Sequence, residues 1–263
     1  MLIICNGAFK SGSTWLHAIV EAILNLRSIE LSEIPDHYGP QSSPVPRLKE
    51  KTLAAFIAAE DIEQKNYLTK VHFFADSVLS KTYPESVRFL FVERDLRDAI
   101  VSHYHHFSIY RKIKLSFASY YWLVGRFKAY EIWLFNTRAK KYFSDDRFFL
   151  YAAMKADPGA AIQRVCNLLG LAELNAAEVE QVISQTSLDA MRKQAEQGDR
   201  RYYHETGADN SKLFRKGLVG EYKRNFGDRE LGDIENIMQG RFSAFSRGIY
   251  GLVFTLRRKL LYR

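Results

Sequence analysis

The stretch Gly7-Ala8-Phe9-Lys10-Ser11-Gly12-Ser13-Thr14-Trp15 decides how this chain folds. It follows the apolar run 2–5 and precedes an apolar-periodic stretch over 14–26, so the sequence predicts a strand, a glycine turn and a helix in succession. In such a turn the first amides of the helix point at an anion, and small residues let the main chain approach phosphate oxygens closely. The stretch therefore predicts an anion-binding loop, with an ordinary strand-to-helix turn as the alternative.

The lysine of this loop is not where a kinase needs it. Nucleoside-triphosphate loops follow the pattern G-x-x-x-x-G-K-[ST], in which the lysine reaches the β- and γ-phosphates and the hydroxyl holds Mg²⁺. Gly7 and Gly12 keep the spacing of the glycines, but Ser13 stands at the lysine position and Lys10 lies inside the loop. We therefore expect the ligand not to be a magnesium triphosphate, and a P-loop nucleotide kinase or ATPase is the alternative function.

The order K-S-G-S-T-W over 10–15 resembles the K-S-G-T-T-W loop of the cytosolic-type sulfotransferases. Those enzymes take a sulfuryl group from 3′-phosphoadenosine 5′-phosphosulfate (PAPS) and release adenosine 3′,5′-bisphosphate (PAP). The resemblance implies that the loop binds the 5′-phosphosulfate of this donor. The residues implied are Lys10, Ser11, Gly12, Ser13 and Thr14.

A second motif lies over 88–104, where an apolar strand, a charged turn and an amphipathic helix are predicted in succession. It is similar to the family signature R-N-P-[KR]-D-x-x-x-S-x-Y, which implies that Arg94 and Ser102 grip the 3′-phosphate of the donor. A guanidinium fork and a hydroxyl suit a dianionic phosphate. Taken alone, Arg94 and Asp95 would be interpreted as a surface charge pair. The spacing of the motif and its context favour the phosphate site.

A third motif, over 214–226, is close to the late family pattern R-K-G-x-x-G-[DE]-[WY]-K. The resemblance implies that Arg215, Lys216 and the main chain of Gly217 complete the 3′-phosphate site. Three motifs in the order of the family extend from Lys10 to residue 226. The chain up to about residue 226 is therefore identified as a member of this family.

The catalytic residues are implied by Lys70-Val71-His72, which looks like the K-x-H element of the family. In this interpretation His72 removes the proton of the acceptor, while Lys70 and Lys10 stabilise charge on the sulfuryl group in transit. A lone histidine after a strand is more often structural, but the 22 positions that separate His72 from Arg94 match the family. By analogy with phosphoryl transfer we expect an in-line transfer, and no metal is required.

The resemblance places the adenine of the donor near Trp15, Tyr151, Thr186 and Leu188. Trp15 is expected to stack on the base, and Tyr151 to offer its hydroxyl near the edge of the base. Two departures from the family occur here. The pattern Y-E-D-[ML] is replaced by Y-A-A-M over 151–154, and Leu188 stands where an aromatic residue is usual. The missing acids leave the rigidity of this part of the site open.

Strand patterns over 67–71, 89–92 and 148–151 alternate with helical ones. This order predicts an α/β fold: a single P-loop-like domain with a mostly parallel β-sheet flanked by helices. In such a sheet ligands collect beyond the carboxyl ends of the strands, where the motifs begin. We expect a sulfotransferase domain over residues 1–240 and a basic amphipathic tail over 241–263.

The composition is that of a globular protein with a basic surface. The 263 residues include 47% hydrophobic ones, and the formal net charge is +8, which suits an anionic donor, a nucleic acid or an anionic membrane. No nucleic-acid motif is present, so no nucleic-acid partner is predicted. Cys5 and Cys166 are expected to be buried thiols rather than a disulfide or metal ligands. No leader or transmembrane pattern is visible, which predicts a cytoplasmic protein.

The acceptor is expected to be a small molecule with a hydroxyl or amine, but its identity stays open because no motif fixes the acceptor pocket. The tail over 241–263 interleaves apolar and basic residues, as a helix on an anionic membrane surface does. A helix packed on the core with a solvated cationic face is the other interpretation. Contact with membrane would favour an amphipathic or lipid-like acceptor, and a peripheral membrane-binding module is the third functional class.

Overall fold

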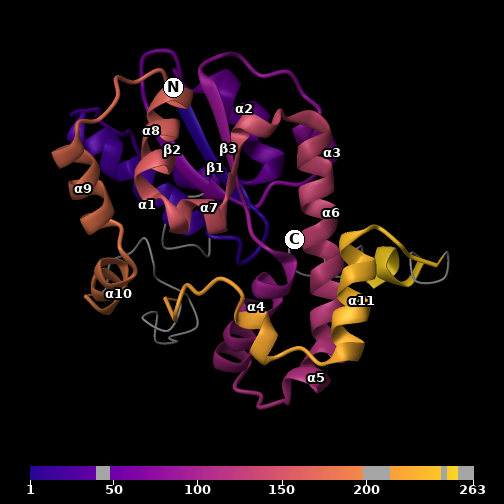
Figure 1. Cartoon of the computed structure of the whole chain (residues 1–263). Coiled ribbons are helices and arrows are strands. Elements are labelled where there is room, and N and C mark those ends of the chain that lie inside the picture. The colour runs from indigo at the N-terminus through magenta and orange to yellow at the C-terminus, as the bar shows by residue number, and fades with distance from the viewer. Residues whose placement is uncertain (40–47, 198–213, 244–247, 254–263) are drawn as a thin grey trace. The chain divides into compact units, whose positions relative to one another are not determined.

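The structure is a computed structural model that describes residues 1–39, 48–197, 214–243 and 248–253 (Figure 1). The chain forms two compact units. The first combines Met1–Arg94 with Arg138–Gly217, and the second combines Asp95–Thr137 with Leu218–Arg263.

The first unit is built on a four-stranded parallel sheet in the order β2-β1-β3-β4. Its strands are β1 (Leu2–Gly7), β2 (Tyr67–Val71), β3 (Val87–Glu93) and β4 (Phe148–Leu150). β1 is central, and its Cys5 lies opposite Lys70 of β2 and Leu90 of β3. Because all strands run the same way, their carboxyl ends meet at one edge of the sheet, which confirms the predicted fold class.

The helices that lie wholly in this unit are α1 (Ser13–Leu26), α2 (Leu53–Ala59), α3 (Asp76–Leu79), α7 (Tyr151–Ala156), α8 (Pro158–Leu169), α9 (Ala176–Gln185) and α10 (Leu188–Glu196), with single 3-10 turns at η1 (Asp36–Tyr38), η2 (Glu50–Thr52) and η4 (Asp145–Arg147). α8 begins as its sequence predicts, because the side chain of Asp157 accepts a hydrogen bond from the amide of Ala160. It ends at Gly170, whose φ of 69° is left-handed.

Each face of the sheet is covered by a different kind of side chain. On one face Ile3 and Cys5 of β1 pack with aliphatic residues of α1 and α8, which lie beside the sheet in Figure 1. On the other face Phe89 and Phe91 of β3 stack with each other, and Phe91 stacks on Phe148 of β4 with ring centroids 4.8 Å apart. Cys5 and Cys166 are both free and buried, as predicted.

The second unit is helical. It contains α4 (Leu96–Arg111), α5 (Phe117–Tyr120), the π-turn η3 (Tyr121–Gly125), the first part of α6 (Arg126–Tyr142), the turn η7 (Glu221–Arg224) and α11 (Asp228–Met238). Asp233 of α11 ties this unit together, because it accepts hydrogen bonds from the hydroxyl of Tyr121 and the guanidinium of Arg126. Burial and the nearby carboxylate of Asp233 raise the pKa of Tyr121 well above its usual range, so this phenol stays protonated.

The described part of the C-terminal tail is attached to the second unit by aromatic packing. Residues 248–253 are helical, and the buried Tyr250 stacks on Tyr130 with ring centroids 4.8 Å apart. Phe242 packs edge-on against both rings. This stretch matches the interpretation of a helix packed on the core. Residues 244–247 and 254–263 lie outside the described residues, so the membrane contact of the tail stays a prediction.

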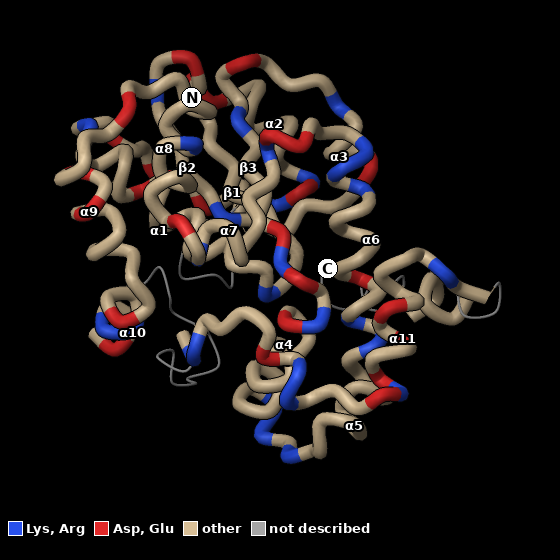
Figure 2. Tube along the Cα trace, in the orientation of Figure 1, with Lys and Arg blue, Asp and Glu red and all other residues tan. Residues whose placement is uncertain are grey.

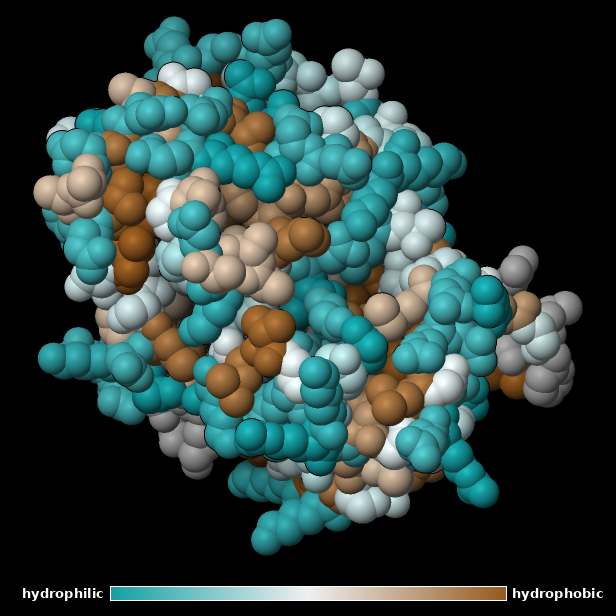
Figure 3. Space-filling view, in the orientation of Figure 1, coloured by the Kyte–Doolittle hydropathy of each residue, from teal (hydrophilic) through white to brown (hydrophobic). Residues whose placement is uncertain are grey.

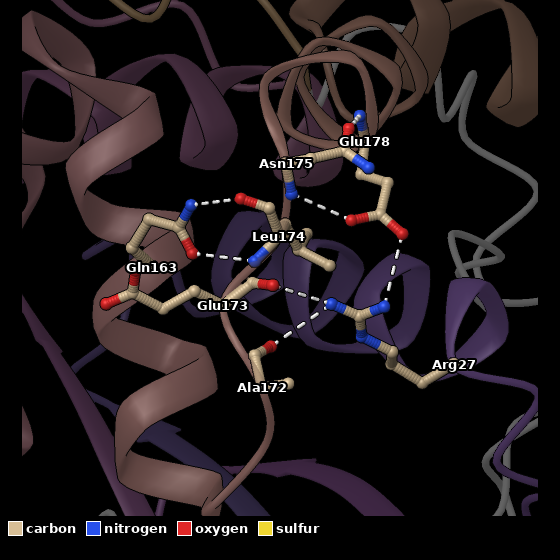
Figure 4. Close-up of polar contacts among 7 residues, drawn as sticks. All are labelled: Arg27, Gln163, Ala172, Glu173, Leu174, Asn175 and Glu178. Carbon is tan, nitrogen blue, oxygen red and sulfur yellow. Dashed lines mark hydrogen bonds and ion pairs between the residues drawn. The ribbon is translucent and has the colours of Figure 1, made fainter.

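Arg27, the residue that caps the carboxyl end of α1, joins α1 to the connection between α8 and α9 (Figure 4). Its guanidinium donates to the carbonyl oxygens of Ala172 and Glu173 and to the carboxylate of Glu178. We expect Arg27→Ala to lower the free energy of unfolding by about 1–3 kcal/mol, since it leaves these acceptors without their charged donor. Urea denaturation of wild type and variant measures this difference.

Glu178→Gln is the matched control, because it keeps an oxygen acceptor for Arg27 and removes only the ionic part of a half-exposed pair. Such pairs contribute little, so we expect the control to lose less than about 1 kcal/mol. An equal loss in both variants would contradict the assignment of the stabilisation to the carbonyl contacts.

Candidate active site

The loop between β1 and α1 has the left-handed main chain that an anion cradle needs. Lys10 has a φ of 65° and Gly12 a φ of 111°. The amide and the hydroxyl of Ser11 both donate to the carbonyl of Ala8, which holds the loop closed. α1 begins at Ser13 without a side chain that accepts from its first amides. The start of this helix therefore has no built-in carboxylate or hydroxyl that would compete with an anion.

Gly12 is required by a close approach as well as by its backbone. A Cβ atom at this position would lie 2.7 Å from Cδ2 of Tyr151. Tyr151 is the first residue of α7 and follows β4 directly. The loop and the end of the fourth strand are thus in van der Waals contact, at the edge of the sheet where the carboxyl ends of the strands meet.

Tyr151 contacts three further predicted donor-site residues within the first unit. The guanidinium carbon of Arg94 lies 4.6 Å from the centroid of the Tyr151 ring, and Trp15 meets the same ring edge-on with centroids 5.7 Å apart. The Tyr151 hydroxyl donates to the carbonyl of Gly217, whose φ of 58° is left-handed. These contacts anchor the end of β4 in place of the two acids that the sequence lacks at 152 and 153.

Three cations of the first unit gather at this loop. Burial, followed by the positive charges of Arg94 and Arg215, lowers the pKa of Lys10 to about 8. None of the ion pairs among the described residues joins Lys10 to a carboxylate. Positive charges that lie close together, with no carboxylate paired to the lysine, create a site for a multivalent anion.

The predicted catalytic residues lie at the end of β2, beside the loop. Lys70 donates from Nζ to the hydroxyl of Thr14 at 3.0 Å. Nδ1 of His72 lies 2.6 Å from the carbonyl oxygen of Gly7. Because a carbonyl can only accept, Nδ1 carries the proton, and the basic lone pair of the neutral ring is on Nε2. His72 is half-buried and its ring lies 5.5 Å from that of Phe9.

In the stretch Thr186-Ser187-Leu188, the first two residues bond at helix ends and the third lies near the loop over 214–217. The hydroxyl of Thr186 donates to the carbonyl of Val182, and Ser187 caps α10 by accepting from the amide of Ala190. Leu188 lies near Gly217, because a Cβ atom at Gly217 would be 3.9 Å from its Cδ2. Their contact with adenine stays a prediction.

Two predicted donor residues are less closely connected. Lys216 is exposed, and Ser102 is a half-buried residue of α4 in the second unit. The structure brings the other residues together within the first unit, and the roles of Lys216 and Ser102 at the 3′-phosphate stay predictions.

Sequence reasoning missed the residues that anchor the late motif. Arg192 of α10 donates to the carbonyl oxygens of Phe214 and Arg215, so it holds the main chain that carries the third cation. In the second unit the buried carboxylate of Asp98 accepts from the amides of Gly220 and Tyr222. These partners are separated by more than 20 positions along the chain and have no motif in common, so only the fold brings them together.

The comparisons with known proteins agree with this geometry. Residues 2–246 match the model of the sulfotransferase domain family, so the chain belongs to that family. The membership confirms the resemblance seen in the three motifs and favours sulfuryl transfer over the kinase interpretation.

Individual relatives are distant in sequence. Flavonol 3-sulfotransferase of Flaveria bidentis is 23% identical over 261 residues, which cover 89% of this chain and 80% of that protein. Cytosolic sulfotransferase 6 of Arabidopsis thaliana is 23% identical over 255 residues, with 88% and 75% covered. Among solved structures, mouse sulfotransferase SULT7A1 complexed with PAP superposes with a TM-score of 0.65 at 17% identity, over 91% of this chain and 83% of that one. The superposition shows that the fold is shared.

The surface has several charged and apolar areas. Lys and Arg gather at the end of α4 and just beyond it, where Arg111, Lys112 and Lys114 are exposed (Figure 2). Apolar areas on the visible face are separated by hydrophilic ones (Figure 3). None of the described helices is long and apolar enough to cross a bilayer, and the same residues contain no cluster of metal-ligating side chains.

Replacement of Gly12 tests the contact between the loop and Tyr151. We expect Gly12→Ala to lower the free energy of unfolding by about 2–4 kcal/mol, because the new Cβ both overlaps Tyr151 and imposes strain at a left-handed φ. Thermal and urea denaturation measure the loss.

Gly170→Ala separates the two causes. Gly170 also has a positive φ, of 69°, but a Cβ there meets nothing within 4 Å. We expect this control to lose only the backbone part, about 1 kcal/mol. If both variants lose the same stability, the close approach of Tyr151 to the loop is refuted.

Proposed function

We propose that this protein transfers a sulfuryl group from PAPS to a hydroxyl or amine of a small-molecule acceptor and releases PAP. Its membership of the sulfotransferase family supports the reaction class. The observation that carries the proposal is the group of cations at the loop, where burial, followed by the positive charges of Arg94 and Arg215, lowers the pKa of Lys10. A donor with phosphates at both ends of its ribose supplies the negative charge that such a group requires.

The residues present fit the donor. The cradle at Gly12 has no room for a side chain, and Lys10 adds a charge beside the first amides of α1, which suits the 5′-phosphosulfate. Arg94 and Arg215 would hold the 3′-phosphate, together with Ser102, Lys216 and the main chain of Gly217. The aromatic pair Trp15 and Tyr151, with Thr186 and Leu188, would form the adenine side.

The chemistry assigned to this chain is proton removal and charge stabilisation. The bound donor supplies the sulfuryl group. Nδ1–H of His72 donates a hydrogen bond to the carbonyl of Gly7, so the ring takes the proton of the acceptor at Nε2. Lys70 is held beside the loop by Thr14, where it and Lys10 offset negative charge that develops during transfer. Positioning and electrostatics of this kind carry most of the catalysis in group transfer with a loose transition state.

The proposed class of acceptor and the proposed cellular location are supported by the names of the similar proteins. Flavonol 3-sulfotransferase is named for an aromatic hydroxyl compound, which supports a small hydroxylated acceptor for this protein. A cytosolic sulfotransferase among the relatives supports a cytoplasmic location. An amphipathic or lipid-like acceptor and a membrane contact through residues 241–263 are finer predictions, tested by vesicle binding with and without those residues.

Calorimetry with PAP tests the donor site. Arg94→Ala should weaken PAP binding on the order of 100-fold, because a phosphate loses a bidentate cation. Adenosine 5′-phosphate, which lacks the 3′-phosphate, should bind weakly to wild type and lose little more in the variant. Arg147→Ala removes an equal charge at the opposite end of β4 and should bind PAP as wild type does. Equal binding of the two nucleotides by wild type would overturn the proposal.

The pH dependence of PAP binding tests the role of Lys10. The lowered pKa of about 8 means that Lys10 is largely neutral in the free protein above that pH. A bound anion favours the charged amine, so PAP binding above pH 8 takes up a proton, and affinity falls up to about tenfold for each pH unit. Below this pKa Lys10 is already charged and contributes no pH dependence.

Calorimetry in buffers of different ionisation enthalpy measures this proton uptake. Wild type should take up close to one proton at a pH about one unit above the Lys10 pKa, whereas Lys10→Met should take up almost none. Proton uptake that persists in Lys10→Met would show that another group titrates, and the assignment to Lys10 would be wrong.

A further inference from the structure

Asn6 is the last residue of β1 that pairs with β2, and its side chain is completely buried. Asn6 lies opposite Val71, the last residue of β2, so the residues that follow β2 have no ladder partner on β1. The carboxamide of Asn6 takes that place. Its Nδ2 donates to the carbonyl of Phe73 at 2.9 Å, and its Oδ1 accepts from the amide of Phe73 at 3.0 Å. A carboxamide has the donor and the acceptor of a peptide group, so it extends the sheet by one step.

The same carboxamide also reaches the loop. Oδ1 of Asn6 accepts a second hydrogen bond, from the amide of Gly7 at 3.0 Å, and the carbonyl of Gly7 accepts from Nδ1 of His72. Asn6, Gly7, His72 and Phe73 therefore form a closed ring of covalent and hydrogen bonds. Within this ring the imidazole of His72 is fixed relative to the first peptide of the loop.

We propose that Asn6 is a positioning residue for the base His72. This inference rests on the proposed function, in which His72 takes the proton of the acceptor. The carboxamide sets the distance between the Phe73 peptide and Gly7, and that distance decides whether Nδ1 of His72 reaches the Gly7 carbonyl. The bond to this carbonyl fixes both the orientation of the ring and the tautomer that leaves Nε2 basic.

A second anchor separates this role from folding of the segment. The carboxylate of Glu50 accepts from the amides of Phe74 and Ala75, just beyond the residues held by Asn6. Glu50 therefore keeps the segment after His72 attached to η2 when Asn6 is replaced. Loss of the carboxamide is expected to release the Phe73 peptide and the ring of His72 rather than the whole connection.

The test is Asn6→Ala, with ¹⁵N spectra of the histidine rings and transfer assays measured together. In wild type the neutral His72 ring should show the Nδ1-protonated tautomer, and in Asn6→Ala a mixture of both tautomers. With PAPS and a panel of 2-naphthol, a hydroxysteroid and a fatty amine, kcat should fall about 10- to 100-fold. The affinity for PAP should stay within about twofold, because the bonds of Ser11 to Ala8 and the contact of Gly12 with Tyr151 hold the donor cradle.

Thr69→Val is the matched control, since Thr69 is a buried polar residue of β2 whose hydroxyl has no hydrogen-bond partner among the described residues. It should leave kcat and the His72 tautomer unchanged. If Asn6→Ala does not fold, Asn6→Asp provides a second test. When protonated, its carboxyl group imitates the carboxamide, and burial raises its pKa. The melting temperature should approach that of wild type at low pH and fall below it as the pH rises and the group ionises.

The outcomes separate this inference from the proposed function. An Asn6→Ala protein that keeps the single tautomer and the wild-type kcat overturns the positioning role. A loss of PAP affinity as large as the loss of kcat overturns it too, because Asn6 would then act on the donor loop. If wild type binds PAP and adenosine 5′-phosphate equally while Asn6→Ala still changes the tautomer, the positioning role is supported and the proposed function fails.

Discussion

Repulsion among half-buried cations is the constraint on which the rest of the first unit depends. Lys10, Arg94 and Arg215 lie close enough for the two arginines to lower the pKa of the lysine. Each charge loses solvation as it is buried, so the group opposes folding until an anion arrives. The protein offsets this cost with the core on both faces of the sheet and with anchors on each arginine-bearing segment. The site is thus organised before the donor binds, and donor binding relieves the repulsion.

Several anchors of this site are neutral groups. The ring of Tyr151 lies against Arg94, and main-chain carbonyls of the late motif hold Arg192. A carboxamide joins β1 to β2. A carboxylate in these places would hold the segments equally well, but its charge would compete with the donor for the cations. The carboxylate of Asp98 anchors the continuation of the late motif, in the second unit, beyond the cation-bearing residues.

The sequence predicts the fold class and most members of the site, because short motifs record local chemistry. The run from β1 through the loop into α1, and the cap at Asp157, follow from local patterns. The anchors do not. Arg192 and Asn6 act on peptides that are 22 and 67 positions away, and a lone Arg or Asn carries no signal of such a partner. The contact of Tyr151 with Gly12 is hidden for the same reason, since it depends on which strands are neighbours.

The strand order explains why one loop serves both the base and the phosphate grip. β1 lies between β2 and β3, so the residues after its carboxyl end have a neighbour on each side. Asn6 pairs with Val71, one residue before His72, and Gly7 pairs with Val92, two residues before Arg94. Parallel strands in this register must deliver the histidine and the arginine to opposite sides of the same loop. If β1 were an edge strand, the loop would lie beside either the histidine or the arginine but not both. The same loop could then not serve both donor binding and proton removal.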